Sequence, residues 1–145
     1  MSFQNIIQQA QTSGDFQPLV DSIPYAGYIG LEFQRFGDNV IFKLPRNPDN
    51  IGNPILPAIH GGVIGGFMEL SAAINLLMFM DTPLMPKIVD FSLDYLRAGR
   101  DQDTFAECQV WRQGSRVANV AINAWQGDRA NPIATARAHF LLAKK

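Results

Sequence analysis

A long apolar segment in the middle of the chain constrains its fold more than any other feature. From Val63 to Met80 the residues are apolar on nearly every face of a helix with 3.6 residues per turn. A helix that is apolar all round is buried, either in a protein core or in a membrane. The segment therefore predicts one central helix against which the rest of the chain packs.

Glu69 is the only acidic residue inside this segment. A buried carboxylate is costly unless it is paired, hydrogen-bonded or used in chemistry. Steps of three and four residues bring a mostly small set of side chains to its face, namely Gly62, Gly65, Gly66, Ala73 and Leu76. Each helical glycine costs roughly 0.5–1 kcal/mol relative to alanine. The face therefore predicts the close approach of a substrate or of another backbone.

Two simpler interpretations of the segment remain open. It has about the ~20 residues that a membrane-spanning helix needs, but it contains Glu69 and Asn75 and has no basic flank. Alternatively, it is an ordinary core helix in which Glu69 only caps or pairs with a neighbouring group.

Length and charge indicate a single globular domain over residues 1–145. The chain carries 12 basic and 13 acidic residues, and only 17% of its residues are charged. Such a length is typical of one domain, and the low charge suggests that another subunit covers part of the surface. The net charge of −1 and the lack of a basic run argue against nucleic acid as a partner.

The cysteine count and the N-terminus favour a cytoplasmic location. Cys108 is the only cysteine, so no intrachain disulfide can form. It lies in an alternating apolar segment, which indicates a small buried side chain rather than a nucleophile. Residues 1–5 contain no basic residue of the kind that begins a secretory signal.

The N-terminal third of the chain predicts two short helices and a hairpin. Apolar spacing gives a helix over Phe3–Gln11 and a second over Phe16–Ile23, which Pro24 should end. Residues 1–24 are thus expected to form a helical extension. Strands are expected at Tyr28–Phe36 and Val40–Leu44, joined by a Gly-Asp-Asn turn.

A long loop and four strands surround the apolar segment. Pro45–Pro57 has no periodicity and should be a loop that leads into His60. Four strands separated by turn residues follow the helix, at Lys87–Arg97, Thr104–Gln113, Arg116–Gln126 and Ile133–Ala143. No further helix separates them, which predicts an α+β fold in which the central helix packs on an antiparallel four-strand meander.

Three motifs resemble those of the hotdog-fold thioesterases, specifically the subgroup typified by the phenylacetate-degradation thioesterase. They are the segment Asn53–Val63 leading to Glu69, the strand Val89–Arg97 with its leucine-arginine end, and the turn Gly114–Val117. The resemblance covers Tyr25 to Leu142. It implies a curved antiparallel sheet wrapped around one long central helix.

The resemblance also implies an activity and residue roles. Relatives most often hydrolyse acyl-coenzyme A thioesters without a cofactor. By position, Glu69 corresponds to the catalytic carboxylate, acting as general base or nucleophile. Gly61 corresponds to the backbone N–H that polarises the thioester carbonyl, a task that suits a helix N-terminus. Asn53 resembles an asparagine that holds the attacking water, although its offset from His60 is unusual.

The spacing within the motif suggests a dimer. Nine residues separate His60 from Glu69, which is two and a half helical turns at ~100° per residue. The two side chains should therefore point to opposite sides of their helix. The resemblance implies that Gly61 of one chain faces Glu69 of a second copy. We therefore expect a homodimer, with a dimer of dimers as a further option.

One family feature is missing from the sequence. Several relatives carry a Ser or Thr one turn after the carboxylate or on the following strand, where this chain has Ala73 and about Ile88. Ser92, Asp90 or a water could replace that hydroxyl.

The remaining polar residues have both functional and structural interpretations. His60 could act in catalysis or only fix the loop by hydrogen bonding. Substrate contacts are expected from Gly62 and from arginines at strand ends, which could bind coenzyme A phosphates or simply be solvated: Arg97, Arg100, Arg112 and Arg116. His139 is expected on the surface. Two histidines without a cluster of further ligands predict no metal site.

The sequence thus favours an acyl-CoA thioesterase. A hotdog-fold hydratase or dehydratase is the first alternative, but the Gly-His-Phe-Pro and His-Thr-Asp motifs of those enzymes are missing. A non-catalytic acyl-thioester binder is the second alternative.

Overall fold

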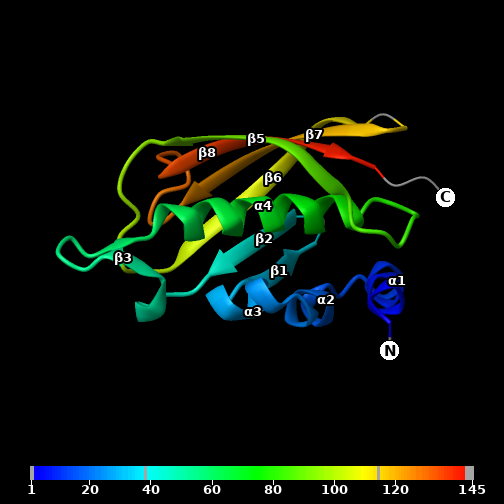
Figure 1. The fold of residues 1–145 in the computed structure, drawn as a ribbon, viewed down its shortest axis with the longest axis horizontal. Helices are drawn as coiled ribbons and strands as arrows, with labels where there is room; N and C mark the ends of the chain where they lie inside the picture. The colour runs from blue at the N-terminus through cyan, green and yellow to red at the C-terminus, as the bar shows by residue number, and fades with distance from the viewer. Residues whose placement is uncertain (1, 38, 114, 143–145) are drawn as a thin grey trace.

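The computed structural model describes residues 2–37, 39–113 and 115–142. One long helix, α4, is enclosed by a curved sheet on one side and by short N-terminal helices on the other (Figure 1). The elements are α1 (Phe3–Ser13), α2 (Gln17–Ser22), α3 (Pro24–Ile29), β1 (Glu32–Phe36), β2 (Asn39–Leu44), the 3₁₀ turn η1 (Pro48–Asn50), β3 (Ile51–Asn53), β4 (Ala58–Ile59), α4 (Gly61–Leu77), β5 (Lys87–Tyr95), β6 (Thr104–Gln113), β7 (Val117–Trp125) and β8 (Ala134–Leu141).

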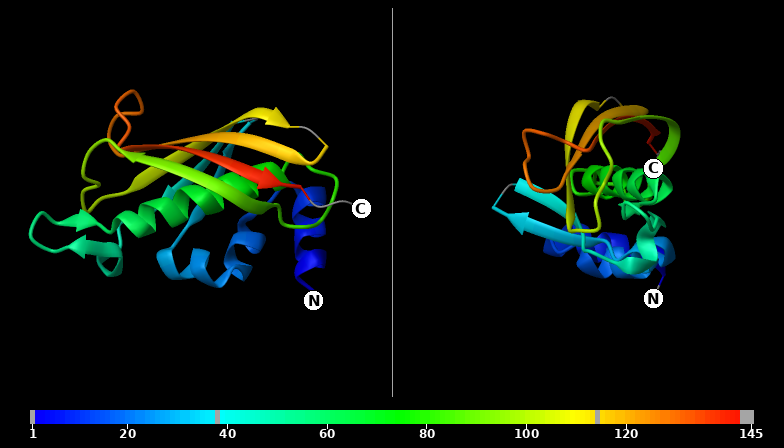
Figure 2. Two further views of the ribbon diagram at one scale, coloured as in Figure 1. Left: turned by 45° about the horizontal axis from the view of Figure 1, so that its top comes forward. Right: turned by 90° about the vertical axis from the view of Figure 1, so that its left-hand side faces the viewer.

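The six-stranded antiparallel sheet has the order β1-β2-β6-β7-β8-β5. It curves around α4, which is seen nearly end-on in the right-hand view of Figure 2. The predicted α+β class and antiparallel sheet are confirmed, but the four-strand meander is wrong. Only β6, β7 and β8 follow one another in space, because residues 96–103 carry the chain across one end of the sheet. This connection places β5 at the far edge, paired with β8.

Alternation along β7 and β8 builds the contact with α4. On each strand every second residue is buried on the concave face, with Ala118, Val120, Ile122 and Ala124 on β7 and Ala134, Ala136, Ala138 and Phe140 on β8. The alanines are small and allow the fully buried α4 side chains Phe67, Ile74 and Leu77 to come close to the sheet. The predicted alternation is therefore confirmed.

The N-terminal segment contains three helices rather than two. Pro24 does not end the helical region, because it occupies the first turn of α3, where its missing N–H and fixed φ are tolerated. Strand β1 consequently starts at Glu32 and not at Tyr28. The helices bury Ile7, Leu19 and Ile29 in the same core as α4.

Helix α4 ends at Leu77, three residues before the predicted end at Met80. The side-chain amide of Gln11, on α1, lies within hydrogen-bonding distance of three main-chain oxygens at and after the end of α4: Leu77 at 3.2 Å, Met80 at 2.9 Å and Thr82 at 3.1 Å. This distant side chain satisfies carbonyls that would otherwise continue the helix. No helix in the described ranges is long and apolar enough to cross a membrane.

The segment predicted as the loop Pro45–Pro57 is partly ordered. It contains η1 and β3, and β3 pairs with β4 in a separate two-stranded sheet. Buried Asn50 holds this hairpin to the body, because its Nδ2 donates to the main-chain oxygen of Ile29 at 2.9 Å. Gly114 of the predicted turn and Ala143 of the last predicted strand lie outside the described residues.

Candidate active site

The N-terminus of α4 leaves one main-chain donor free. His60 caps the helix: its Nδ1 accepts from the Gly62 N–H at 2.9 Å, and its main-chain oxygen accepts from Val63 at 3.0 Å and Ile64 at 3.2 Å. Within the described part of the chain, the Gly61 N–H alone among the first four donors has no hydrogen-bond partner. The helix dipole adds positive potential at this position.

Close packing against β3 fixes the capping residue. A Cβ on Gly52 would lie 2.8 Å from the Cα of His60, so only glycine fits there. The His60 N–H donates to the main-chain oxygen of Asn50 at 2.9 Å. The structure therefore supports a positioning role for His60, because its backbone and Nδ1 are both used in shaping the helix start.

Tyr95, at the end of β5, provides a second support. Its hydroxyl donates to the main-chain oxygen of Gly61 at 2.7 Å. A Cβ on Gly61 would lie 3.1 Å from that hydroxyl oxygen, so the tyrosine leaves little room for a side chain at residue 61. The sequence interpretation missed Tyr95, since nothing local links it to a residue 34 positions away.

The small-residue face of α4 lies between β5 and α3. A Cβ on Gly65 would meet Leu93 of β5 at 3.3 Å, and one on Gly66 would meet the ring of Tyr25 of α3 at 2.7 Å. Along this face Gly62 is exposed, whereas Gly65, Gly66 and Glu69 are half-buried. Side chains of β5 and α3 therefore lie close to these glycines, whereas the approach of a substrate or of another backbone stays a prediction.

Glu69 itself is half-buried rather than enclosed in the core. It makes no ion pair and no side-chain hydrogen bond with any residue in the described ranges. Eight residues separate it from Gly61, which is about 12 Å along the helix axis at 1.5 Å per residue. The carboxylate and the free N–H of one chain therefore do not meet at one reacting atom.

Asn53 lies at the end of β3, on the exposed β3–β4 hairpin. Its Oδ1 accepts from the Ile55 N–H at 3.0 Å, which shapes the turn. The side-chain NH₂ has no partner among the described residues and remains available to hold a water.

A cavity of about 360 Å³ opens beside Gly61, lined among others by Ile64, Tyr95 and Arg97. Arg97 is exposed at its rim. Gly61 itself is among the residues that line this cavity.

The four arginines considered for substrate binding are not together in one chain. Arg100 follows Arg97 closely, and its backbone is bridged by the Gln126 side chain at 3.0 and 2.8 Å. Arg116 precedes β7 at the end of the sheet opposite to Arg97. About eight strand residues separate the two ends, which corresponds to about 25 Å. Arg112 belongs to β6, and its side chain is outside the described part.

Two candidates for the missing hydroxyl face the wrong way. Ser92 and Asp90 pair with Arg137 and His139 of β8 and lie on the sheet face away from α4. The Asp90 Oδ2 lies 3.1 Å from His139 Nδ1, within hydrogen-bonding distance. Neither side chain can therefore assist Glu69 of its own chain.

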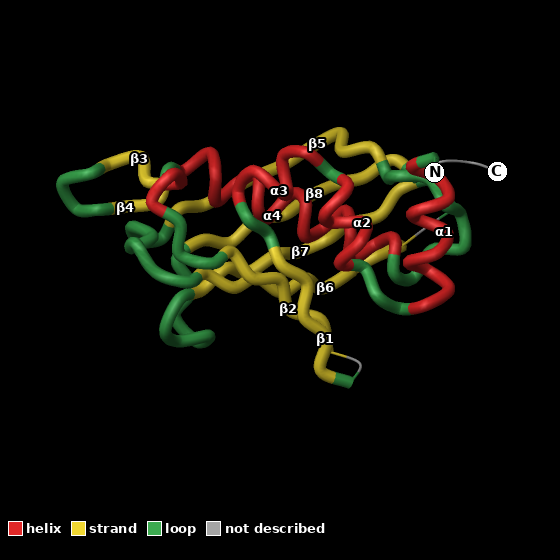
Figure 3. Tube along the Cα trace, turned by 90° about the horizontal axis from the view of Figure 1, so that it is seen from below, coloured by secondary structure: helices red, strands yellow, loops and turns green. Residues whose placement is uncertain are grey.

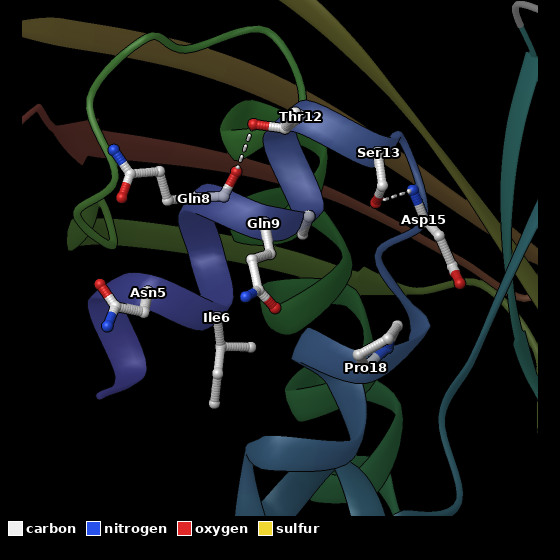
Figure 4. Close-up of a pocket in the computed structure, with 9 residues that line it drawn as sticks. Asn5, Ile6, Gln8, Gln9, Thr12, Ser13, Asp15 and Pro18 are labelled. Carbon is white, nitrogen blue, oxygen red and sulfur yellow. Dashed lines mark hydrogen bonds between the residues drawn. The ribbon is translucent and has the colours of Figure 1, made fainter. Parts of the chain in front are cut away.

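A larger cavity, about 720 Å³, lies far from this site, beside α1 and the start of α2 (Figure 4). Its lining is mainly uncharged and polar, and Thr12 and Ser13 already bond to Gln8 and Asp15. It contains no free helix N-terminus or paired acid and base. Among the described residues, no group of three or more potential ligands could hold a metal ion.

Helix α4, its curved sheet and the free N–H at Gly61 define a hotdog-fold protein. The family model described as Thioesterase superfamily matches residues 56–133, which include Gly61, Glu69 and Arg97. The chain belongs to this superfamily, and membership supports thioester hydrolysis as its class of activity. No curated protein matches the chain.

Solved structures share the fold over nearly the whole chain. A protein from Chromobacterium violaceum is 42% identical, with 97% of this chain and 98% of that chain covered and a TM-score of 0.80. A phenylacetic acid degradation-related protein from Ralstonia eutropha is 17% identical over 88% and 98%, with a TM-score of 0.74. A Bacillus halodurans protein whose structure contains CoA is 16% identical over 99% and 93%, with a TM-score of 0.77. The resemblance to hotdog-fold thioesterases is confirmed.

Proposed function

We propose that this protein hydrolyses an acyl-CoA thioester to the free acid and CoA. The observation that carries the proposal is the unpartnered Gly61 N–H, which opens on a cavity at the positive end of α4 in a chain of the Thioesterase superfamily. A donor fixed in this way is suited to a carbonyl oxygen that gains negative charge during attack.

Glu69 supplies the second function of the mechanism. As a general base, its carboxylate takes a proton from water while the water oxygen attacks the thioester carbon. The Gly61 N–H stabilises the oxyanion, and the C–S bond then breaks to release CoA. Direct attack by the carboxylate, followed by hydrolysis of the anhydride, uses the same two groups.

A homodimer brings these groups together. Because Gly61 and Glu69 of one chain are about 12 Å apart along the helix, the site is completed by Glu69 from a second copy. β5 is an edge strand with exposed Val89 and Tyr95, next to the half-buried glycine face of α4. Pairing of β5 with its copy would continue the sheets, and a dimer of dimers is a further assembly of the same unit.

The CoA preference rests on charge near the cavity and on one relative. Arg97 and Arg100 lie near the rim of the Gly61 cavity and can bind phosphates. Arg116 would have to come from the second copy. The Bacillus halodurans structure contains CoA, and CoA thioesters are consistent with a cytoplasmic protein. Residues 1–145 would form one thioesterase domain, with 1–24 as a helical extension.

A panel of acyl-CoA substrates assayed for thiol release tests the proposal. Time-dependent release of one free thiol per acid formed supports it. A change in acyl-chain unsaturation without thiol release would instead indicate a hydratase or dehydratase. Saturable binding without turnover of any substrate in the panel would indicate an acyl-thioester binder.

A further inference from the structure

The sheet is split between β2 and β6. These strands pair only at Phe42, Lys43 and Leu44 of β2. The first residues of β2, before Phe42, pair with β1 alone and lead away from the rest of the sheet, as the view from below shows (Figure 3). The β6 residues from Glu107 onward pair with β7 on one side only.

A cavity of about 350 Å³ fills the split. Its apolar walls come from Val40 and Ile41 of β2, Val110 of β6 and Phe79 after α4. The ion pair between Arg129 and Glu107 also lines it. The volume lies at the lower end of the range for small-molecule sites, ~300–1,000 Å³, so a ligand here would be small.

Asn75 of α4 gives the cavity a polar group in a buried position. Its side chain lines the cavity, and the residue is only 6% exposed. None of the described residues makes a hydrogen bond to its side-chain amide. An amide that faces a cavity can bond to water or to a ligand that supplies both a donor and an acceptor.

The described residues that line the cavity carry no unpaired charge. Cys108 lines the cavity from β6, and desolvation by burial raises the pKa of its thiol, so it remains an S–H group. The charges of Arg129 and Glu107 neutralise each other. This environment selects against an ionic ligand.

We propose that this cavity binds a small neutral ligand with a short aliphatic body and a primary carboxamide head group that pairs with Asn75. The site is separate from the candidate active site. Asn75 lies six residues after Glu69, which is about 9 Å along the helix axis and roughly 240° around it. The walls of the cavity come from β2 and β6, whereas the glycine face near the candidate active site lies between β5 and α3.

Hexanamide is the test probe, with 2-heptanone as the matched probe that accepts a hydrogen bond but donates none. Titration into ¹⁵N-labelled protein should give saturable shifts at the amides of Val40, Ile41, Phe79, Cys108 and Val110. Hexanamide should bind about two- to tenfold more tightly than 2-heptanone, the effect of one added hydrogen bond.

Two variants make the result decisive. Asn75→Leu keeps the number and branching of the side-chain heavy atoms, removes the amide, and should abolish the preference for hexanamide. Phe79→Ala removes a side chain that is 62% exposed, so it should weaken both probes without disturbing the core, whereas Tyr28→Ala should change neither. Equal affinity of the two probes for the wild type, shifts outside the split, or the absence of saturation would overturn the proposal.

Discussion

The hydroxyl of Tyr95 donates a hydrogen bond of 2.7 Å to the main-chain oxygen of Gly61. The bond ties the end of β5 to the first residue of α4, beside the one main-chain N–H at this helix start that has no partner among the described residues. The edge of the sheet and the proposed oxyanion donor are therefore fixed with respect to each other.

Tyr95→Phe should remove this bond while keeping the ring against Gly61. We expect kcat to fall about two- to tenfold, the usual net value of one hydrogen bond, because the Gly61 peptide becomes less firmly held. Steady-state thiol release measures the effect. Tyr28→Phe, at a tyrosine that is 71% exposed, is the control; an equal loss in both variants would argue against a positioning role for Tyr95.

Gly61→Val should abolish turnover and leave a folded protein. Its Cβ would come within 3.1 Å of the Tyr95 hydroxyl, which displaces the tyrosine and crowds the space that a thioester carbonyl must enter. Gly27→Ala is the matched control, because a Cβ there has no neighbour within 4 Å. Normal kinetics in Gly61→Val, with circular dichroism unchanged, would exclude Gly61 as the oxyanion donor.

Mixing two inactive variants tests whether the site is shared between copies. In the proposed homodimer, the Gly61→Val and Glu69→Gln proteins each lack one group at both sites. After subunit exchange, half of the dimers are mixed, and each mixed dimer has one intact site, so activity should recover to about a quarter of the wild-type value. We expect the recovered activity to sediment with the dimer. A stable wild-type monomer that is active would contradict the shared site.

The Cys108 thiol should react slowly in the folded protein. Burial raises its pKa, so near pH 8 the thiolate that attacks a disulfide reagent is scarce in the native state and more abundant after unfolding. Because the chain has a single cysteine, Ellman's reagent reports on this site alone. Labelling at the same rate with and without denaturant would show that the thiol is not buried.

Periodicity was sufficient to predict most of the elements, but not their spatial order. The predicted Thr104–Gln113 strand matches β6, and the alternation along β7 and β8 is confirmed. The position of β5 beside β8 was not predictable, because adjacency in the sequence says nothing of a connection that crosses the sheet. Pro24 was misinterpreted because proline ends one helix and begins another with equal ease.

For the candidate site, the sequence indicated the helix start and the carboxylate but not their supports. His60 and Gly61 stood out because a histidine and glycines open an apolar helix. Tyr95 approaches Gly61 only through the folded sheet, and Gln11 ends α4 from an element 66 residues away. Contacts of this range depend on tertiary packing, which leaves no local pattern.

Glu69→Gln is the most direct measurement of the central claim. The substitution keeps the volume of the side chain and removes a half-buried charge that pairs with no cation in the described residues. If Glu69 drives hydrolysis, kcat should fall about 10²-fold or more, while the melting temperature holds or rises. Both quantities are measured on the same purified protein. A near-wild-type kcat together with a clear fall in melting temperature would contradict the mechanism and make Glu69 a structural residue.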